Sequence, residues 1–158
     1  MNPGDHVKIS IGVESPRDPE VIRLIEALDA YQTPLYPPES NHLLDVDSLC
    51  ASDIRFFVAR QLGRAVGCGA LRVDASARYG ELKRMFVRPQ VRGLKIGRRL
   101  LSAIEHGART EGLDWVRLET GIHQHEALAL YRKTGYRECA AFGPYQPDPL
   151  SVFMEKAL

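Results

Sequence analysis

The first fifty residues show two patterns of hydrophobic positions, one with the period of a β-strand and one with the period of a helix. Residues 7–13 alternate apolar with small or polar side chains, which predicts a half-buried strand. From Pro19 the apolar residues recur at helical spacing behind an Asp18 N-cap, and this helix should end before Thr33-Pro34. The proline-rich residues 34–42 predict a stiff loop, and residues 45–51 predict a short helix.

Three strands are predicted next, each with a clear end signal. Ile54 to Gln61 and Arg64 to Asp74 are separated by Leu62-Gly63, which predicts a hairpin. The run Tyr79 to Val87 should pair with them and ends at Arg88-Pro89, because proline has no N–H for a ladder. Gly67 and Gly69 in the middle strand mark either a bulge or a close backbone approach.

The second half of the chain mixes helical and strand patterns. Apolar residues from Ile96 to Ala108 share one helical face, and Gly112 marks the C-terminal end of that helix. Residues 115–120 form a strand that can lie parallel to residues 79–87, since the helix between them provides the crossover. A helix at 124–135, strands at 136–140 and 151–156, and a proline-rich loop at 142–149 complete the set.

These elements predict one domain of the α/β class that covers residues 1–158. The order contains about seven strands and about four helices, which gives a mixed, mostly antiparallel twisted sheet with helices on its faces.

The composition of the chain indicates where in the cell the protein is expected. The chain has 44% apolar and 26% charged residues, which are ordinary globular values, and no apolar run reaches the length of a membrane span. The N-terminus shows no signal-peptide pattern, and the three cysteines share no metal-ligand spacing. We therefore expect reduced thiols, a cytoplasmic protein, no membrane partner and no metal.

The net charge of +1 hides an asymmetry between the two parts of the chain. Residues 1–60 hold 10 acids against 5 Lys and Arg, whereas residues 61–158 hold 10 acids against 16. Seven of these cations lie between Lys83 and Arg99, with no acid between Glu81 and Glu105. Few aromatic residues accompany them, so a compact polyphosphate is favoured over a nucleic acid as the partner.

A glycine-containing turn between a strand and a helix indicates where such a polyphosphate binds. The turn runs from Gln90 to Gly97 and opens directly into the helix that begins near Ile96. The unpaired N–H groups and the positive dipole end of a helix N-terminus attract anions, and glycine lets the anion approach closely. The turn matches neither the dinucleotide fingerprint nor the P-loop, because Gly93 and Gly97 are four residues apart and Gly97 precedes two arginines.

Two motifs resemble those of the GCN5-related N-acetyltransferases (GNAT). Residues Arg92 to Gly97 resemble the family's [Q/R]-x-x-G-x-[G/A] acyl-CoA signature, with Lys95 where the family usually has glycine. Residues Gln124 to Tyr136 resemble its N-x-x-A-x-x-L-Y-x-x-x-G-[F/Y] helix, with Gln124 in place of asparagine. The two motifs stand in the family's order about 30 residues apart with a strand between them, which makes the match specific.

The resemblance implies the family fold, in which the strands at Tyr79–Val87 and Trp115–Thr120 splay apart, and acetyl-CoA as cofactor. The implied cofactor-binding residues are Met85, Phe86, Val87, Arg92, Gly93, Leu94, Lys95, Ile96, Gly97, Arg98, Ala127 and Tyr131.

The same resemblance implies catalytic residues. Glu81 is the first candidate for the base that deprotonates an amine, and Glu119 is the second, with Glu39 and Glu126 as outsiders. Tyr131 is the candidate acid that protonates the departing thiolate. Ordinary alternatives stay open: Glu81 can merely pair with a basic neighbour, and Tyr131 can merely pack.

The acceptor is expected to meet residues of the two proline-rich loops. These are Tyr36, Glu39 and His42 in the first loop, and Phe142 and Tyr145 in the second. The leading hypothesis is an acetyl-CoA-dependent N-acetyltransferase that acts on the primary amine of a small metabolite, such as an amino acid. A non-catalytic acyl-CoA sensor and a protein N-acetyltransferase are the alternatives, and a homodimer is compatible with the sequence.

Overall fold

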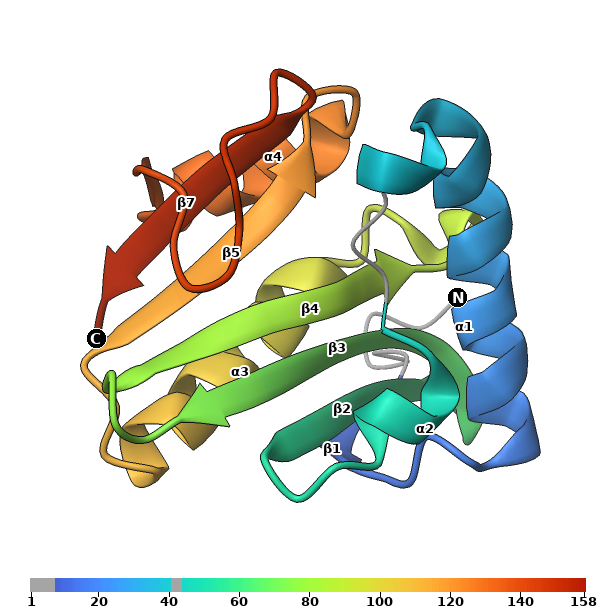
Figure 1. Cartoon of the computed structure of the whole chain (residues 1–158). Helices are drawn as coiled ribbons and strands as arrows, with labels where there is room; N and C mark the ends of the chain where they lie inside the picture. The colour runs from blue at the N-terminus through green and yellow to red at the C-terminus, as the bar shows by residue number, and fades with distance from the viewer. Residues whose placement is uncertain (1–7, 41–43) are drawn as a thin grey trace.

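The structure is a computed structural model that describes residues 8–40 and 44–158. A seven-stranded sheet with the order β1-β2-β3-β4-β5-β7-β6 forms its centre (Figure 1). The strands are β1 Ile9–Val13, β2 Ile54–Gln61, β3 Arg64–Asp74, β4 Tyr79–Val87, β5 Trp115–Gly121, β6 Arg137–Glu138 and β7 Ser151–Ala157. All neighbouring strands are antiparallel except β4 and β5, which are parallel, so the predicted mixed, mostly antiparallel sheet is confirmed.

Within residues 8–40 and 44–158, four α-helices pack on the two faces of the sheet (Figure 1). They are α1 Pro19–Gln32, α2 Val46–Leu49, α3 Ile96–Thr110 and α4 His125–Lys133, with short 3-10 turns η1 Thr33–Leu35, η2 Pro38–Ser40 and η3 Pro89–Val91. One core joins α3 and α4 to the sheet, and a second core joins α1 and Leu49 of α2 to the opposite face. Among the described residues, no helix is long and apolar enough to cross a membrane.

The sequence signals place the ends of most elements correctly. Asp18 caps α1 by accepting hydrogen bonds from the backbone N–H groups of Glu20 and Val21, and α1 ends at Gln32 as predicted. The β2–β3 hairpin turns through Leu62 and Gly63, which both have positive φ. Two details differ from expectation. The stiff loop after α1 contains the turns η1 and η2, and β6 covers only Arg137–Glu138 of the predicted 136–140 strand.

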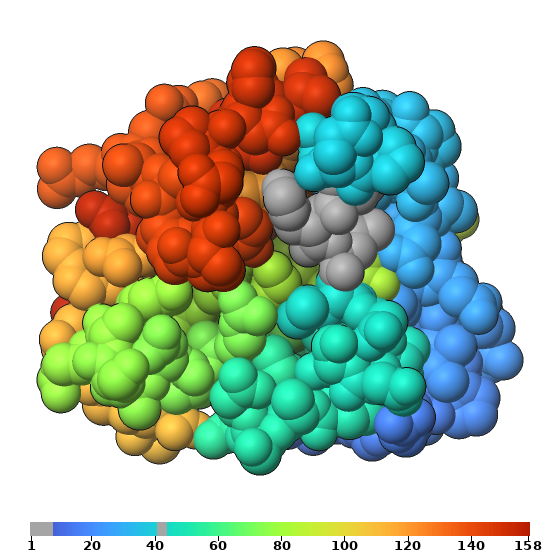
Figure 2. All heavy atoms as spheres, viewed as in Figure 1, coloured from blue at the N-terminus to red at the C-terminus, as the bar shows by residue number. Residues whose placement is uncertain are grey.

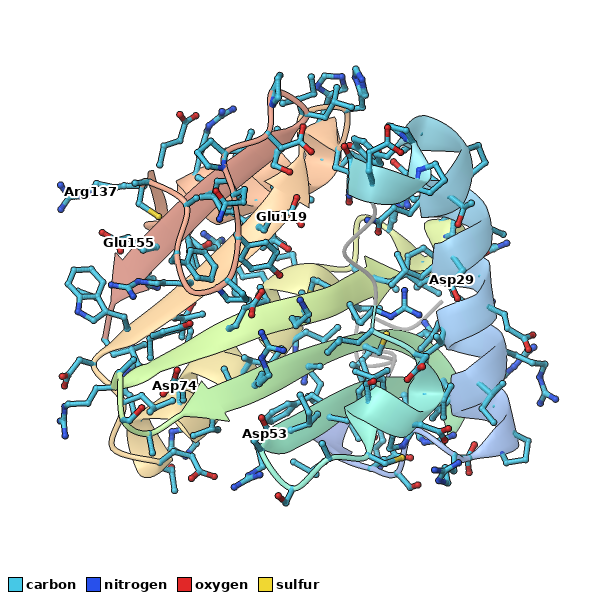
Figure 3. All side chains as sticks on the ribbon, in the orientation of Figure 1. Asp29, Asp53, Asp74, Glu119, Arg137 and Glu155 are labelled. Carbon is cyan, nitrogen blue, oxygen red and sulfur yellow. The ribbon has the colours of Figure 1, made fainter. Side chains whose placement is uncertain are left out.

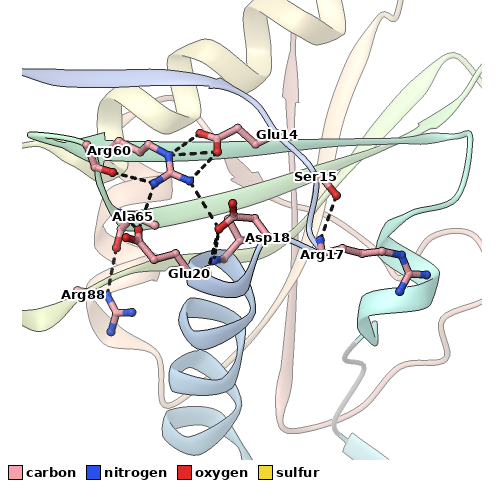
Figure 4. A network of polar contacts seen from close by, with 10 residues as sticks. Glu14, Ser15, Arg17, Asp18, Glu20, Arg60, Ala65 and Arg88 are labelled. Atoms are coloured by element: carbon pink, nitrogen blue, oxygen red, sulfur yellow. Dashed lines mark hydrogen bonds and ion pairs between the residues drawn. The ribbon is translucent and has the colours of Figure 1, made fainter.

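A polar network centred on Arg60 fastens the start of α1 to the β2–β3 hairpin (Figure 4). Arg60 on β2 bonds both carboxylate oxygens of Glu14 and also reaches Glu20 of α1 at 3.1 Å. Glu20 accepts a further hydrogen bond from the backbone N–H of Ala65 at 2.6 Å. The Arg60 side chain is mostly buried, and its charge-assisted hydrogen bonds hold the N-terminus of α1 against β2 and β3.

The parallel pair β4–β5 separates part of the way along its length, and this separation creates the site. The two strands pair from Tyr79 with Trp115 to Leu82 with Leu118, and then diverge (Figure 1). The predicted splay of these strands is therefore confirmed.

A bulge in β4 accompanies the divergence. Cys68 pairs with Phe86 and Ala70 pairs with Lys83, so Gly69 of β3 lies opposite both Arg84 and Met85. A side chain at Gly69 would meet Ile104 of α3 at 2.7 Å. The bulge that the sequence left as one alternative lies opposite Gly69, where side chains approach closely, and the close backbone approach occurs at Gly67, where an added Cβ would lie 3.1 Å from the Phe86 carbonyl oxygen. The extra residue bends β4 locally.

Candidate active site

A cavity of about 370 Å³ opens where β4 ends and leaves β5. Its walls come from α1, the end of β4, the turn before α3, and α4. It is lined by Leu28, Tyr31, Met85, Phe86, Val87, Arg92, Gly93, Gly97, Gln124, Glu126, Ala127 and Leu130. Seven of the twelve residues expected to bind the cofactor are in this set, and they come from the strand, the turn and α4 together.

The other residues expected to bind the cofactor lie near this cavity but do not line it. Ile96 is buried in the core beneath the turn, while the large side chain of Leu94 is 44% exposed. Lys95 and Arg98 flank the helix start without lining the cavity, and Tyr131 lines the neighbouring cavity described below. Leu28 and Tyr31 were missed from the sequence, because they come from α1 and only tertiary packing brings them here.

The turn before α3 has the geometry of an anion-binding helix N-terminus. Lys95 is the N-cap of α3 and lies in the left-handed region at φ 59° and ψ 26°, without a side-chain capping hydrogen bond. This conformation explains why the related motif has glycine at this position, since a Cβ is disfavoured there. The N–H groups of the first turn of α3 consequently lack a side-chain acceptor and are suited to diphosphate oxygens.

Two glycines keep this anion site open. Gly93 has a φ of +90°, a conformation that glycine adopts without strain. At Gly97 an added Cβ would lie 3.1 Å from Leu130 of α4, so the small residue lets α3 and α4 approach across the cavity. The residues present therefore fit a coenzyme A diphosphate held by backbone N–H groups. When bound, the coenzyme would supply the activated thioester.

A second, narrower cavity lies on the other side of Met85, between the diverging strands. It is lined by Gln32, Glu81, Leu82, Lys83, Arg84, Met85, Glu119, Thr120, Gln124 and Tyr131. All three expected catalytic residues, Glu81, Glu119 and Tyr131, surround it. Met85 and Gln124 line both cavities, which makes the two cavities neighbours.

Tyr131 is held in a form that can donate a proton. Its side chain is 4% exposed, and its ring packs against Tyr136 in the core between α3 and α4. Burial, and then the charge of Glu119, raise the pKa of the Tyr131 hydroxyl well above its usual range. The phenol therefore stays protonated at physiological pH, as an acid for a thiolate must.

The two candidate bases differ in how deeply their side chains are enclosed. Glu81 on β4 is 2% exposed and lies 2.6 Å from Arg72 through one carboxylate oxygen. Its other oxygen accepts hydrogen bonds from Lys83 at 3.1 Å and from the Tyr145 hydroxyl. Both oxygens of Glu81 are thus engaged by protein donors, which is the pairing alternative noted from the sequence. An amine would have to displace one of them.

Glu119 on β5 is less enclosed. It lies on the strand beside the divergence, as Figure 3 shows. Its Oε2 accepts a hydrogen bond from Ser151 of β7 at 2.9 Å. Glu119 lines the same cavity as Tyr131 and is close enough to raise the pKa of that phenol.

The expected acceptor residues have diverse environments. Tyr36 is 6% exposed; its hydroxyl accepts a hydrogen bond from the His123 backbone N–H at 3.1 Å and occupies the space where Gly121 has no Cβ. Phe142 packs edge-on against Tyr79 and Phe153 in a small core of its own.

Tyr145 lies in the second proline-rich loop, residues 142–149, which we call the late loop, and its hydroxyl donates a hydrogen bond to Glu81. Glu39 is exposed in η2. His42 lies outside the described residues. These contacts anchor the loops, and a role in acceptor binding stays a prediction for each residue. Within the described ranges, no three His, Cys, Asp or Glu residues gather as a metal site.

An ion pair at the mouth of the larger cavity yields a test. Arg92 Nη1 lies 3.2 Å from Glu126 Oε2, joining the turn to the first turn of α4. The pair holds an anion beside the place where the diphosphate would bind. Glu126→Gln should therefore tighten coenzyme A binding about twofold to fivefold at low salt, as measured by calorimetric titration.

The matched control for Glu126→Gln is Glu138→Gln. Glu138 forms a similarly exposed pair with Arg132 at 3.3 Å but lines neither cavity. Its replacement should leave the affinity for coenzyme A unchanged. A Glu126→Gln variant that binds coenzyme A more weakly would contradict this role of the ion pair.

Comparisons with known proteins agree with this geometry. The family described as acetyltransferase (GNAT) domain matches residues 52–138. An IAA acetyltransferase of Azospirillum brasilense is 56% identical over 150 residues, which cover 95% of this chain and 98% of that protein. A crystal structure from Klebsiella pneumoniae, described provisionally as an acyl-CoA N-acyltransferase, is 44% identical with a TM-score of 0.81 and covers 96% of this chain and 99% of its own.

The fold is also that of a chain crystallised with the coenzyme. The PaiA N-acetyltransferase of Thermoplasma acidophilum, solved in complex with coenzyme A, has a TM-score of 0.72 at 21% identity, over 96% of this chain and 99% of its own. The family match, the relative and the paired cavities point to one conclusion. The chain belongs to the GNAT family of N-acetyltransferases.

Proposed function

We propose that this enzyme transfers an acetyl group directly from acetyl-CoA to the primary amine of a small metabolite, within a ternary complex. The observation that carries the proposal is the contact between the two cavities through Met85 and Gln124. A thioester whose diphosphate lies at the α3 N-terminus would extend along β4 to the point where the strands diverge. An amine in the narrower cavity would then face its carbonyl carbon.

The reaction needs one side chain that accepts a proton from the amine and another that donates a proton to the departing thiolate. A free amine has a pKa of about 10.4 and is protonated at neutral pH, so a base must remove a proton before nitrogen can attack. In the proposed reaction the C–N bond forms, the C–S bond breaks, and the thiolate takes the proton of the Tyr131 hydroxyl. The nitrogen gives up two protons in all. Glu119, the less enclosed of the two carboxylates, accepts the first before attack, directly or through water, and the second restores the Tyr131 hydroxyl as the amide forms.

The loops over the cleft support a small acceptor. Ser40 of η2 donates a hydrogen bond to Asp148 of the late loop at 2.7 Å, which ties the two loops together. Tyr145 fixes the late loop to Glu81 on β4. In Figure 2 the late loop, coloured orange-red, covers the β5 side of this face, and η1 and η2, coloured cyan, lie opposite it. A cleft with tied loops favours a single compound over a protein tail, and the Azospirillum relative is likewise named for one compound, IAA.

The proposal is tested by following thiol release from acetyl-CoA with a panel of amines and amino acids. Thiol release that requires a small amine supports the proposal. Binding of coenzyme A without thiol release for any acceptor would identify a sensor instead. Release only with peptides or proteins would identify a protein N-acetyltransferase.

The choice of base gives a separate prediction. Glu119→Gln should lower kcat/KM about a hundredfold at pH 7. Its rate should then rise about tenfold per pH unit towards the pKa of the amine, since the free amine then forms without a base. Glu81→Gln should weaken the loop anchor without producing this pH-dependent recovery. Recovery at high pH in Glu81→Gln alone would assign the base to Glu81.

A further inference from the structure

A buried arginine beside the narrower cavity has no role in the reaction described above. Arg84 occupies the bulge of β4 at a φ of 57°, in the left-handed region that residues with a Cβ rarely adopt. Its side chain is 2% exposed. Strained backbone at a bulge is found where a side chain must be aimed at a site, so the direction of this guanidinium is significant.

The guanidinium has donor capacity that the protein leaves unused. Nη1 donates to Asp29 of α1 at 2.6 Å, and the Asp29 side chain is itself 42% exposed. Nε of Arg84 is buried and has no hydrogen-bond partner among the described residues. It is the single buried side-chain N or O atom in the described part of the chain that lacks one. Leaving a buried donor unpaired is unfavourable, so its retention calls for a specific explanation, and a bound polar ligand is one.

Arg84 lies where its guanidinium could contact the amine substrate that accepts the acetyl group. Arg84 lines the same cavity as Glu119 and Tyr131. Figure 3 shows Glu119 on β5, one of the two diverging strands, and Asp29 on α1, beyond the end of β4. Lys83 also lines the cavity, but it is bonded to Glu81 and Tyr145. Among the described residues, Arg84 is therefore the cation of this cavity that has a buried nitrogen with no hydrogen-bond partner.

We propose that the acceptor carries a carboxylate together with its amine, and that Arg84 binds this carboxylate. The inference rests on the proposed function and narrows its substrate class to amino acids. The planar guanidinium matches a carboxylate in geometry and charge, and Glu119 at the other side of the cavity would receive the ammonium. The two charged ends of an amino acid would thereby be oriented by groups of opposite charge.

The experiment compares matched acceptor pairs. Glycine, β-alanine, methionine and phenylalanine are each assayed beside the corresponding carboxamide, with thiol release as the readout. The amine of a carboxamide is less basic, so it is more easily deprotonated but less nucleophilic. The preference for the carboxylate is therefore assigned to Arg84 only through its loss in the Arg84→Met variant. We expect the wild-type enzyme to favour the carboxylate of at least one pair by about tenfold or more in kcat/KM.

The decisive variant is Arg84→Met, which keeps an unbranched side chain and removes the charge. It should lower kcat/KM for the preferred carboxylate about tenfold to a hundredfold, mainly through KM, with about a twofold change or less for the carboxamide. Its affinity for coenzyme A should be unchanged. Asp29→Asn removes the ion pair but keeps Arg84, so it should retain the carboxylate preference.

The outcomes separate this inference from the proposed function. Equal losses for carboxylate and carboxamide in Arg84→Met, or the same loss in Asp29→Asn, would assign Arg84 a structural role and overturn the inference.

Absence of thiol release with every acceptor would contradict the proposed function instead. In that case binding of N-acetylmethionine and its carboxamide to the coenzyme-loaded protein decides the inference. Equal affinities in wild type and Arg84→Met would overturn it, and weaker carboxylate binding in Arg84→Met would support it.

Discussion

We expect Gly97→Glu to abolish the binding of coenzyme A. A Cβ at this position would already lie 3.1 Å from Leu130 and 3.8 Å from Val87, so a longer side chain must extend into the cavity that both residues line or flank. The new carboxylate would stand in the first turn of α3, where the diphosphate should meet the N–H groups. Crowding and like-charge repulsion together should raise the Kd by at least about a hundredfold in a calorimetric titration.

Two further variants show whether the loss of coenzyme A affinity in Gly97→Glu comes from this position in particular. Gly12→Glu makes the same chemical change on β1, where an added Cβ meets nothing within 4 Å, and it should leave the affinity unaltered. Gly97→Ala adds only the Cβ against the flexible end of Leu130 and should weaken binding modestly. Retained affinity in a folded Gly97→Glu protein would mean that the diphosphate binds elsewhere.

Tyr131→Phe should lower kcat about tenfold to a hundredfold while leaving the Kd for coenzyme A nearly unchanged. The substitution removes one hydroxyl and keeps the ring that packs against Tyr136. That hydroxyl is the proposed source of the proton for the departing thiolate, and proton transfer by a positioned side chain contributes at this scale. Steady-state kinetics with the best acceptor, together with calorimetry, separate the two quantities.

Tyr136→Phe is the matched control for this prediction. Tyr136 donates a hydrogen bond to the buried Glu105 at 3.0 Å, and Glu105 keeps Lys156 at 2.8 Å when that hydroxyl is removed. This variant should lose about 1–2 kcal/mol of stability with kcat unchanged. If Tyr131→Phe turns over as fast as wild type, Tyr131 is not the acid and only packs.

The strands and helices of this fold follow from local patterns in the sequence. The alternation of apolar residues and the turn residues predicted β2, β3 and β4 with their observed ends. The hairpin through Gly63 and the proline at position 89 leave little freedom in where these strands can end. The Asp18-Pro19 pair gave the start of α1 for the same reason. The extent of β6 was predicted less well, since a two-residue edge strand depends on pairing with β7 and not on its own sequence.

The site was predictable where a motif is continuous in the chain, and less so where it is assembled from distant segments. The Arg92–Gly97 turn was located from sequence, whereas the contribution of α1 through Leu28 and Tyr31 depends on how α1 crosses the sheet. The partners of Glu81 come from β3 and from the late loop, so its occupied oxygens could not be anticipated. The left-handed Arg84 in the β4 bulge has no signal of its own, because the bulge depends on how β4 pairs with β3 around Gly69.

The most direct test of this account is a crystal structure of the protein with acetyl-CoA. The account predicts diphosphate oxygens within hydrogen-bonding distance of the backbone N–H groups of the Gly93–Arg98 turn. It also predicts that the thioester lies beside Met85, between the two cavities, with its sulfur near the Tyr131 hydroxyl. A complex in which the coenzyme binds elsewhere and leaves the α3 N-terminus open to solvent would contradict the account.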